Sequence, residues 1–200
     1  MDTTTSVIRP SPELYGKTTR LSPIDQIAPR DYNSIHFFFR LSSDADKRSM
    51  FKNLETGLLN TAHEIPQLLC CICKADNDRD ELELRYSAKS GATIAYRDFT
   101  SLKLRDHWPH GDFDDLEREH FPLSKLERHR VLAATPPPGA ERLPALAVQA
   151  NFIQGGLILT ACLHVSGSLL TWICSILTVD SIRYVMALAF TSSLLLSRSI

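Results

Sequence analysis

From Leu143 to Val179 the sequence contains no Asp, Glu, Lys or Arg, and this uncharged run limits how the chain can fold. After residue 150 only Asp180, Arg183 and Arg198 are charged, although the whole chain has 22 basic and 23 acidic residues. So long an apolar stretch must lie inside a protein core or inside a membrane. The other charged residues all belong to the first 150, and the 200 residues of the chain are enough for one domain of ordinary size with a core.

The beginning of the uncharged run predicts a β-hairpin. Two apolar, β-prone segments within LAVQANFIQGGLILTACLH (146–164) lie on either side of Gln154, Gly155 and Gly156. Glycines between two such segments are typical of a hairpin turn.

Upstream segments predict a helix and further strands. The aromatic run Ile35–Phe39 predicts a buried strand. Apolar residues at three- and four-residue spacing predict an amphipathic helix over 45–63, which polar residues before it could cap and Pro66 ends. Strands are also expected at 67–75, 82–88 and 92–99, the first two forming a hairpin around a charged turn.

These elements together predict an α+β fold, an α/β two-layer arrangement with a mixed sheet and a long helix. Residues 1–17 are polar and contain two prolines, so we expect a flexible leader there. An apolar C-terminal tail follows the predicted hairpin.

Composition excludes some classes of function. The net charge is −1 and no basic patch stands out, so we expect no nucleic-acid partner. The N-terminus has no apolar segment typical of a secretory signal peptide. An odd number of cysteines in apolar surroundings indicates reduced, buried thiols in a cytoplasmic protein; they are Cys70, Cys71, Cys73, Cys162 and Cys174.

Two groups of residues have some features of metal ligands, but neither is predicted to bind a metal. The spacing of the three cysteines at 70–73 does not suit tetrahedral zinc, and buried strand thiols explain them better. His107 and His110, with Asp112 nearby, have HxxH spacing, but the proline and glycine inside RDHWPHGDFDD (105–115) favour a solvated loop over the helix that would align the imidazoles. The charged segment Asp114–Glu119 is expected to be a solvated face or loop.

Several segments occur in an order that resembles a known family. LSPIDQ (21–26), a strand, a long helix ending near EIPQLL (64–69), and QANFIQGGLIL (149–159) are similar to the N-terminal half of fungal acyl-CoA-dependent acyltransferases. These are the trichothecene 3-O-acetyltransferase-like and BAHD-type enzymes of the chloramphenicol acetyltransferase-like superfamily. The resemblance covers about residues 18–164 and implies a truncated, partial N-terminal domain of a two-domain enzyme. It implies acyl-CoA as a co-substrate, no permanently bound cofactor and a small-molecule alcohol or amine as acceptor; we expect a monomer.

The resemblance also implies a catalytic residue. In the family the motif HxxxD, often HHxxxDG, follows the GGLIL strand, and its histidine takes the proton of the acceptor. His164 lies at the position of the first histidine of that pair, and the second falls on Val165. If His164 is itself the base, Ser168 occupies the position of the motif's aspartate. No DFGWG motif occurs in the chain. His164 is therefore the only catalytic candidate, and we expect this chain to be inactive; a structural sheet histidine without a catalytic role is the alternative.

Asp25 and Gln26 in LSPIDQ are expected to orient the first strand against the helix, with direct substrate contact as the second interpretation.

Residues 165–200 do not resemble the family, and two interpretations of them remain open. Val165-Ser166 can be encoded by GTGAGT or GTAAGT, the usual start of a eukaryotic intron, so the tail could be translated intron. Alternatively, 155–197 could hold a membrane segment, because 155–179 is uncharged and long enough to cross about 30 Å of hydrocarbon. The alternative function is then a membrane-associated, tail-anchored protein without catalysis.

Overall fold

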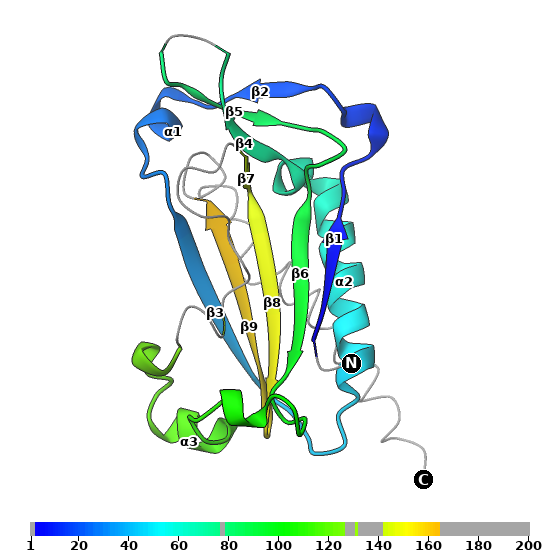
Figure 1. Ribbon diagram of the computed structural model, residues 1–200, viewed down its shortest axis with the longest axis vertical. Helices are drawn as coiled ribbons and strands as arrows, with labels where there is room; N and C mark the ends of the chain where they lie inside the picture. The colour runs from blue at the N-terminus through cyan, green and yellow to red at the C-terminus, as the bar shows by residue number, and fades with distance from the viewer. Residues whose placement is uncertain (1–2, 77–78, 127–130, 132–141, 165–200) are drawn as a thin grey trace.

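The computed structural model describes residues 3–76, 79–126, 131 and 142–164, and these form two β-sheets and a long helix (Figure 1). The larger sheet is mixed, because β6 and β8 run parallel while all other neighbouring strands run antiparallel. Its strands lie in the order β1 (Thr3–Ile8), β6 (Ala92–Asp98), β8 (Leu146–Ile153), β9 (Gly156–His164) and β3 (Tyr32–Arg40). The predicted α+β fold with a mixed sheet is thus confirmed.

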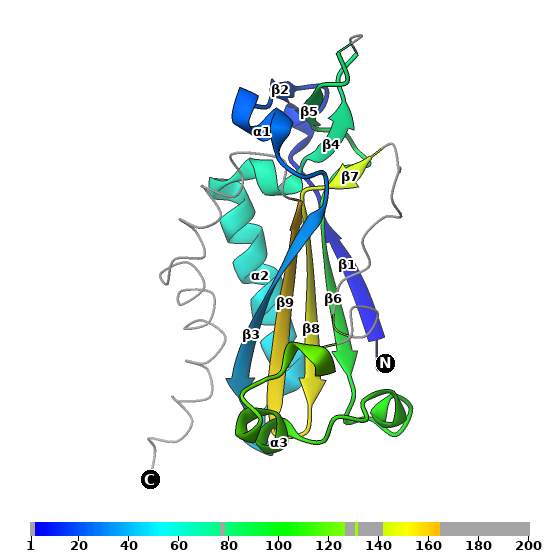
Figure 2. The same cartoon turned by 90° about the vertical axis from the view of Figure 1, so that its left-hand side faces the viewer.

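The long helix α2 (Lys47–Glu64) lies along one face of the larger sheet, as Figure 2 shows. The Asp46 carboxylate accepts hydrogen bonds from the N–H groups of Arg48 and Ser49, which caps the first turn. Pro66 opens the short 3-10 helix η2 (Pro66–Leu69), so the helix ends where proline would break its hydrogen bonds.

Two apolar clusters pack against opposite faces of the larger sheet. The larger cluster joins the buried side of α2 to side chains of every second residue in β6, β8 and β9. The second cluster lies on the other face, beside α3 (Phe113–Arg118). It contains Phe99, Trp108, Phe113, Leu116, Leu126, Val131, Ile153 and Ile158.

A smaller sheet lies at one end of the larger one (Figures 1 and 2). Its strand order is β2 (Thr18–Arg20), β5 (Leu82–Arg85), β4 (Cys71–Lys74) and β7 (Leu143–Pro144). The predicted hairpin around the charged turn is confirmed as β4–β5, although the first residues of its expected strand form η2 instead. The helix α1 (Pro23–Ile27) precedes β3.

The remaining described elements are short. A 3-10 helix, η1 (Pro12–Leu14), lies between β1 and β2. The charged region after β6, for which the sequence shows little periodicity, contains η3 (Arg105–His107), α3 and η4 (Leu123–Lys125).

The leader expected at residues 1–17 contains a strand and a short 3-10 helix. Residues 3–8 form β1, which pairs antiparallel with β6 at one edge of the larger sheet. The predicted strand at Ile35–Phe39 is confirmed within β3, but its side chains are only half-buried. The reason is its place at the other edge of the sheet, where a neighbouring strand lies on one side only among the described residues.

Candidate functional site

The β8–β9 hairpin brings His164 to the end of the larger sheet. The hairpin turns at Gly155, whose φ of 75° lies in the left-handed region that glycine adopts without strain. At Gly156 a Cβ atom would lie 2.0 Å from Cδ2 of Phe113, so only glycine lets α3 approach the turn. The predicted hairpin is confirmed, and the nine residues of β9 are all buried.

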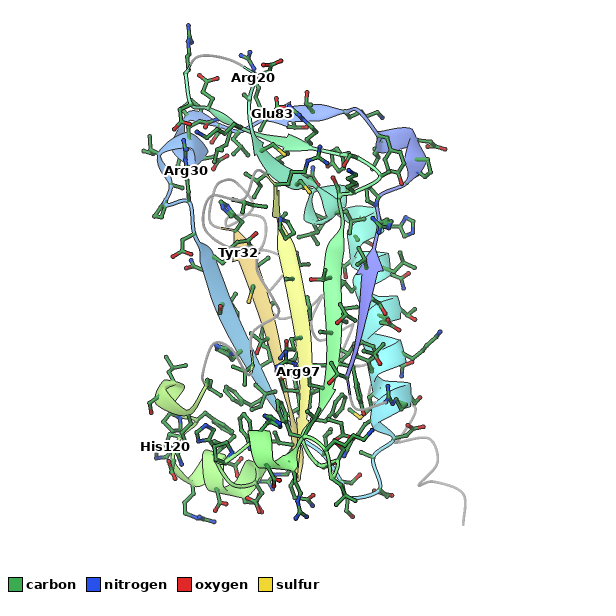
Figure 3. The ribbon with its side chains drawn as sticks, viewed as in Figure 1. Arg20, Arg30, Tyr32, Glu83, Arg97 and His120 are labelled. Atoms are coloured by element: carbon green, nitrogen blue, oxygen red, sulfur yellow. The ribbon has the colours of Figure 1, made fainter. Side chains whose placement is uncertain are left out.

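His164 lies in a closed corner between strands. It is opposite Tyr32 in the β3–β9 register, and the two rings meet edge to face with centroids 5.0 Å apart and an interplanar angle of 86°. The Tyr32 hydroxyl donates to the carbonyl of Pro144 at 2.8 Å, while the backbone N–H of His164 donates to the carbonyl of Ala145 at 3.1 Å. Only 1% of His164 is exposed. Figure 3 shows Tyr32 at the end of β3 nearest the smaller sheet, below Arg30.

Burial determines the protonation states of His164 and Tyr32 in this corner. It lowers the pKa of His164 to about 4, with Asp31 acting in the opposite direction and Arg30 adding to the decrease. Burial also raises the pKa of Tyr32, and the nearby thiols Cys71 and Cys162 add to that increase. At neutral pH the imidazole is therefore uncharged and chemically able to accept a proton.

Two further polar pairs continue from this corner along β3 and β9. Ser34 Oγ and Cys162 Sγ are hydrogen bonded at 3.6 Å, and His36 Nδ1 and Thr160 Oγ1 at 3.0 Å. Together with the Tyr32–His164 pair they form what we call the polar ladder, which lies on the sheet face opposite α2.

Backbone geometry explains why the side chains of the polar ladder are in contact. The N–H of Leu41 donates to the carbonyl of Gly155 at 2.9 Å, which sets the alternation of hydrogen bonds between β3 and β9. Hydrogen-bonded pairs recur at every second residue, so the odd-numbered residues of β3, like Leu41, exchange backbone hydrogen bonds with β9. The even-numbered residues, which supply the ladder, belong to the non-hydrogen-bonded pairs, where opposing side chains lie closest.

Two buried amides extend the polar surface onto β8. Gln149 Nε2 donates to Asn151 Oδ1 at 2.6 Å, and Asn151 Nδ2 donates to the carbonyls of Val131 at 3.1 Å and Ile158 at 3.2 Å. Both amide residues are at most 1% exposed. In the sequence, their spacing of two within an otherwise apolar strand is the signal that they share one face of the sheet.

Asp25 and Gln26 have structural contacts, but not those expected from the sequence. Asp25 forms a capping box with Ser22 at the start of α1. The Gln26 amide donates to the carbonyl of Leu82 and accepts from its N–H, both at 2.8 Å. These contacts attach α1 to β5 of the smaller sheet rather than the first strand to the long helix.

The remaining candidates from the sequence are the cysteines, the histidines near Trp108 and the charged segment 114–119. Cys70, Cys71, Cys73 and Cys162 are buried and not joined in disulfides, and Cys174 lies outside the described residues. His110 packs edge to face on Trp108, with ring centroids 5.2 Å apart. Within the described ranges no three His, Cys, Asp or Glu side chains gather as metal ligands. Asp114–Glu119 falls largely in α3, where Asp114 and Glu117 form ion pairs with Arg40.

The membrane and motif predictions fall partly outside the described residues. The first part of the uncharged run is strands β8 and β9 of the larger sheet, and Val165, Ser168 and the rest of the 165–200 tail are not described. In the part of the chain that is described, no helix has the length and apolar character needed to span a membrane.

Comparison with known proteins identifies similar sequences. Residues 32–166 match the family described as the trichothecene 3-O-acetyltransferase-like N-terminal domain. The acyltransferase easC of Emericella nidulans is 34% identical over 146 residues, which cover 72% of this chain and 30% of the relative. The acyltransferase cm3D of Cordyceps militaris is 30% identical over 165 residues, which cover 80% of this chain and 34% of the relative. The chain thus spans about a third of the length of these relatives.

Solved structures show the same fold. TRI101 of F. sporotrichioides, complexed with coenzyme A and T-2, superposes with a TM-score of 0.65 at 21% identity, covering 88% of this chain and 41% of that one. TRI101 of F. graminearum, complexed with coenzyme A and deoxynivalenol, gives a TM-score of 0.69 at 16% identity, covering 88% of this chain and 39% of that one.

Proposed function

Because this chain belongs to the trichothecene 3-O-acetyltransferase-like N-terminal domain family, we propose that it forms the N-terminal part of an acyl-CoA-dependent acyltransferase. The observation on which this rests is the match over 32–166, which includes the β8–β9 hairpin and ends just after His164. The proposed division of the chain is a partial acyltransferase domain at 18–164, followed by a 165–200 tail foreign to the family.

The proposed reaction transfers an acyl group from coenzyme A to the hydroxyl or amine of a small secondary metabolite. Support comes from similar folds that hold coenzyme A together with T-2 or deoxynivalenol. In this reaction a base takes the proton of the acceptor, whose oxygen or nitrogen attacks the thioester carbonyl; the C–S bond then breaks, and the thiolate of coenzyme A takes up a proton. Coenzyme A acts as co-substrate.

His164 is the proposed catalytic candidate, and its environment supports only part of that role. Burial keeps the imidazole neutral at neutral pH, which a proton acceptor requires. Only 1% of His164 is exposed, however, so an acceptor can reach the ring only if the residues that cover it move away. Val165 and Ser168 stand where the family motif has its second histidine or its aspartate. We therefore propose that the 200-residue chain is inactive by itself.

A thiol-release assay tests the proposed inactivity. The purified chain is incubated with acetyl-CoA and a panel of alcohols and amines that includes deoxynivalenol, with His164→Ala as the matched control. We expect equal, background rates for both proteins. Turnover that His164→Ala abolishes would show that the chain is itself an enzyme.

A chimera tests the proposed reaction class. Residues 1–164 are joined to the part of easC that follows its matched segment, and the easC part alone serves as control. We expect acetyl-CoA consumption by the chimera only. A chimera that is folded and binds coenzyme A, yet transfers no acyl group to any acceptor that easC itself uses, would contradict the proposal.

Translated intron is the proposed origin of residues 165–200. Sequencing of transcripts and of genomic DNA from codon 160 onward tests this. We expect GT-AGT at codons 165–166 and a spliced frame that restores HHxxxDG and, later, DFGWG. Mature transcripts that retain the tail and lack those motifs would contradict this origin.

A further inference from the structure

We propose that Tyr32 is a positioning residue for His164: its ring holds the imidazole in place at the end of β9, and its hydroxyl anchors that arrangement to β7. The functional meaning of this inference rests on the proposed role of His164, but the contacts themselves do not. No motif of the family resemblance includes Tyr32.

The contacts of Tyr32 bind three strands at one point. Its ring contacts His164 across the β3–β9 register, with centroids 5.0 Å apart. Its hydroxyl donates to the carbonyl of Pro144, and the N–H of His164 donates to the next carbonyl, that of Ala145. The Tyr32 side chain and the His164 backbone therefore bind two successive carbonyl groups where β7 leads into β8. A shift of His164 along β9 would break both the ring contact and its own hydrogen bond.

The position of Tyr32 in the sheet explains its effect on the imidazole. The pair occupies a non-hydrogen-bonded position of the β3–β9 ladder, where opposing side chains lie closest. β3 is the edge strand among the described residues, so the Tyr32 ring stands between His164 and that open side of the sheet. Removing the ring would let water approach a histidine that is now 1% exposed.

The titratable groups around this corner are few and come from several elements. Arg30 and Asp31 precede β3 and act on His164 in opposite directions. Arg30 also forms an ion pair with Asp80 at 2.9 Å. Cys162 of β9 and Cys71 of β4 lie near the Tyr32 hydroxyl. Burial is the largest cause of the low pKa of His164, so the ring that excludes water should control that pKa more than these charges do.

Two substitutions separate the ring from the hydroxyl. Tyr32→Leu removes the aromatic ring and keeps an apolar side chain, whereas Tyr32→Phe removes only the hydroxyl. Tyr86→Phe is the matched control, because Tyr86 is another buried tyrosine of the described residues, beyond the end of β5. The measurements are NMR titration of the His164 ring, assigned with His164→Gln, and hydrogen exchange of the His164 amide.

We expect Tyr32→Leu to raise the pKa of His164 by about one unit, which is a tenfold larger protonation constant. Tyr32→Phe should leave this pKa low and speed exchange of the His164 amide by about tenfold, because one hydrogen bond that fixes the Pro144–Ala145 segment is lost. Tyr86→Phe should change neither quantity.

An unchanged His164 pKa in a folded Tyr32→Leu protein would overturn the proposal. If that variant does not fold, Tyr32→Phe decides, and unchanged exchange of the His164 amide overturns it. Neither readout needs turnover, so a failure here is distinct from a failure of the proposed acyl transfer.

Discussion

The buried histidine at the end of β9 should make the stability of the protein depend on pH, and His164→Gln should remove that dependence. Burial lowers the pKa of His164 from 6.5 to about 4 in the folded chain. Between these values the unfolded chain binds a proton at this position and the folded chain does not. Acidification through this range therefore favours unfolding, and the stability contribution is fully present above pH 6.5.

The size of the effect follows from the difference between the two pKa values. One pKa unit corresponds to about 1.4 kcal/mol, so the full difference would give about 3 kcal/mol. Between pH 7 and pH 4.5 the pH does not yet reach the folded-state pKa of His164, so about 2 kcal/mol of this difference is the expected loss.

The assay is urea unfolding followed by far-ultraviolet circular dichroism at several pH values between 7 and 4.5. Wild-type protein should lose about 2 kcal/mol more than His164→Gln over this range. Carboxylates titrate in both proteins and cancel in the comparison. His36→Gln is the control on the same sheet face, since burial lowers the pKa of His36 too and its half-buried ring should contribute less.

Parallel stability curves for wild type and His164→Gln would refute this reasoning. They would mean that water reaches the imidazole in the folded chain, so that its pKa is not lowered by burial.

Three other substitutions test contacts elsewhere in the fold. Gln26→Ala should cost about 2 kcal/mol in urea unfolding, because it breaks both hydrogen bonds to the backbone of Leu82. Asn151→Ala should cost about 3 kcal/mol, measured by thermal unfolding, because a fully buried amide network loses its centre. Gly156→Ala should destabilise the protein, since the new methyl group would overlap the ring of Phe113; in a double-mutant cycle measured by urea unfolding, Phe113→Ala should relieve most of that cost.

The sequence predicted the elements whose hydrophobic pattern is strong and local. The helix α2 has apolar residues at helical spacing and ends at a proline, and the β8–β9 hairpin has glycines between two apolar strands. The uncharged run raised a membrane interpretation because fully buried strands and spanning segments share the same composition. The buried strands β8 and β9 make up most of its described part.

Elements that depend on distant partners were not predicted. Strand β1 consists mainly of threonine and serine, and only its pairing with β6 fixes it in the sheet. Similarly, Gln26 has no local signal for its bonds to Leu82. Within the site, resemblance drew attention to His164, whereas Tyr32 becomes relevant only through the register of β3 against β9.

The order of strands in the larger sheet has a consequence for protein synthesis. Two of its three interior strands, β8 and β9, are the last of its five strands to leave the ribosome. Until residue 164 has emerged, β3 lacks the strand with which it pairs, and α2 lacks the apolar side chains of β8 and β9 in its cluster. The nascent chain must therefore expose aromatic and aliphatic side chains for most of its translation, and its folding yield should depend on chaperones that bind such surfaces.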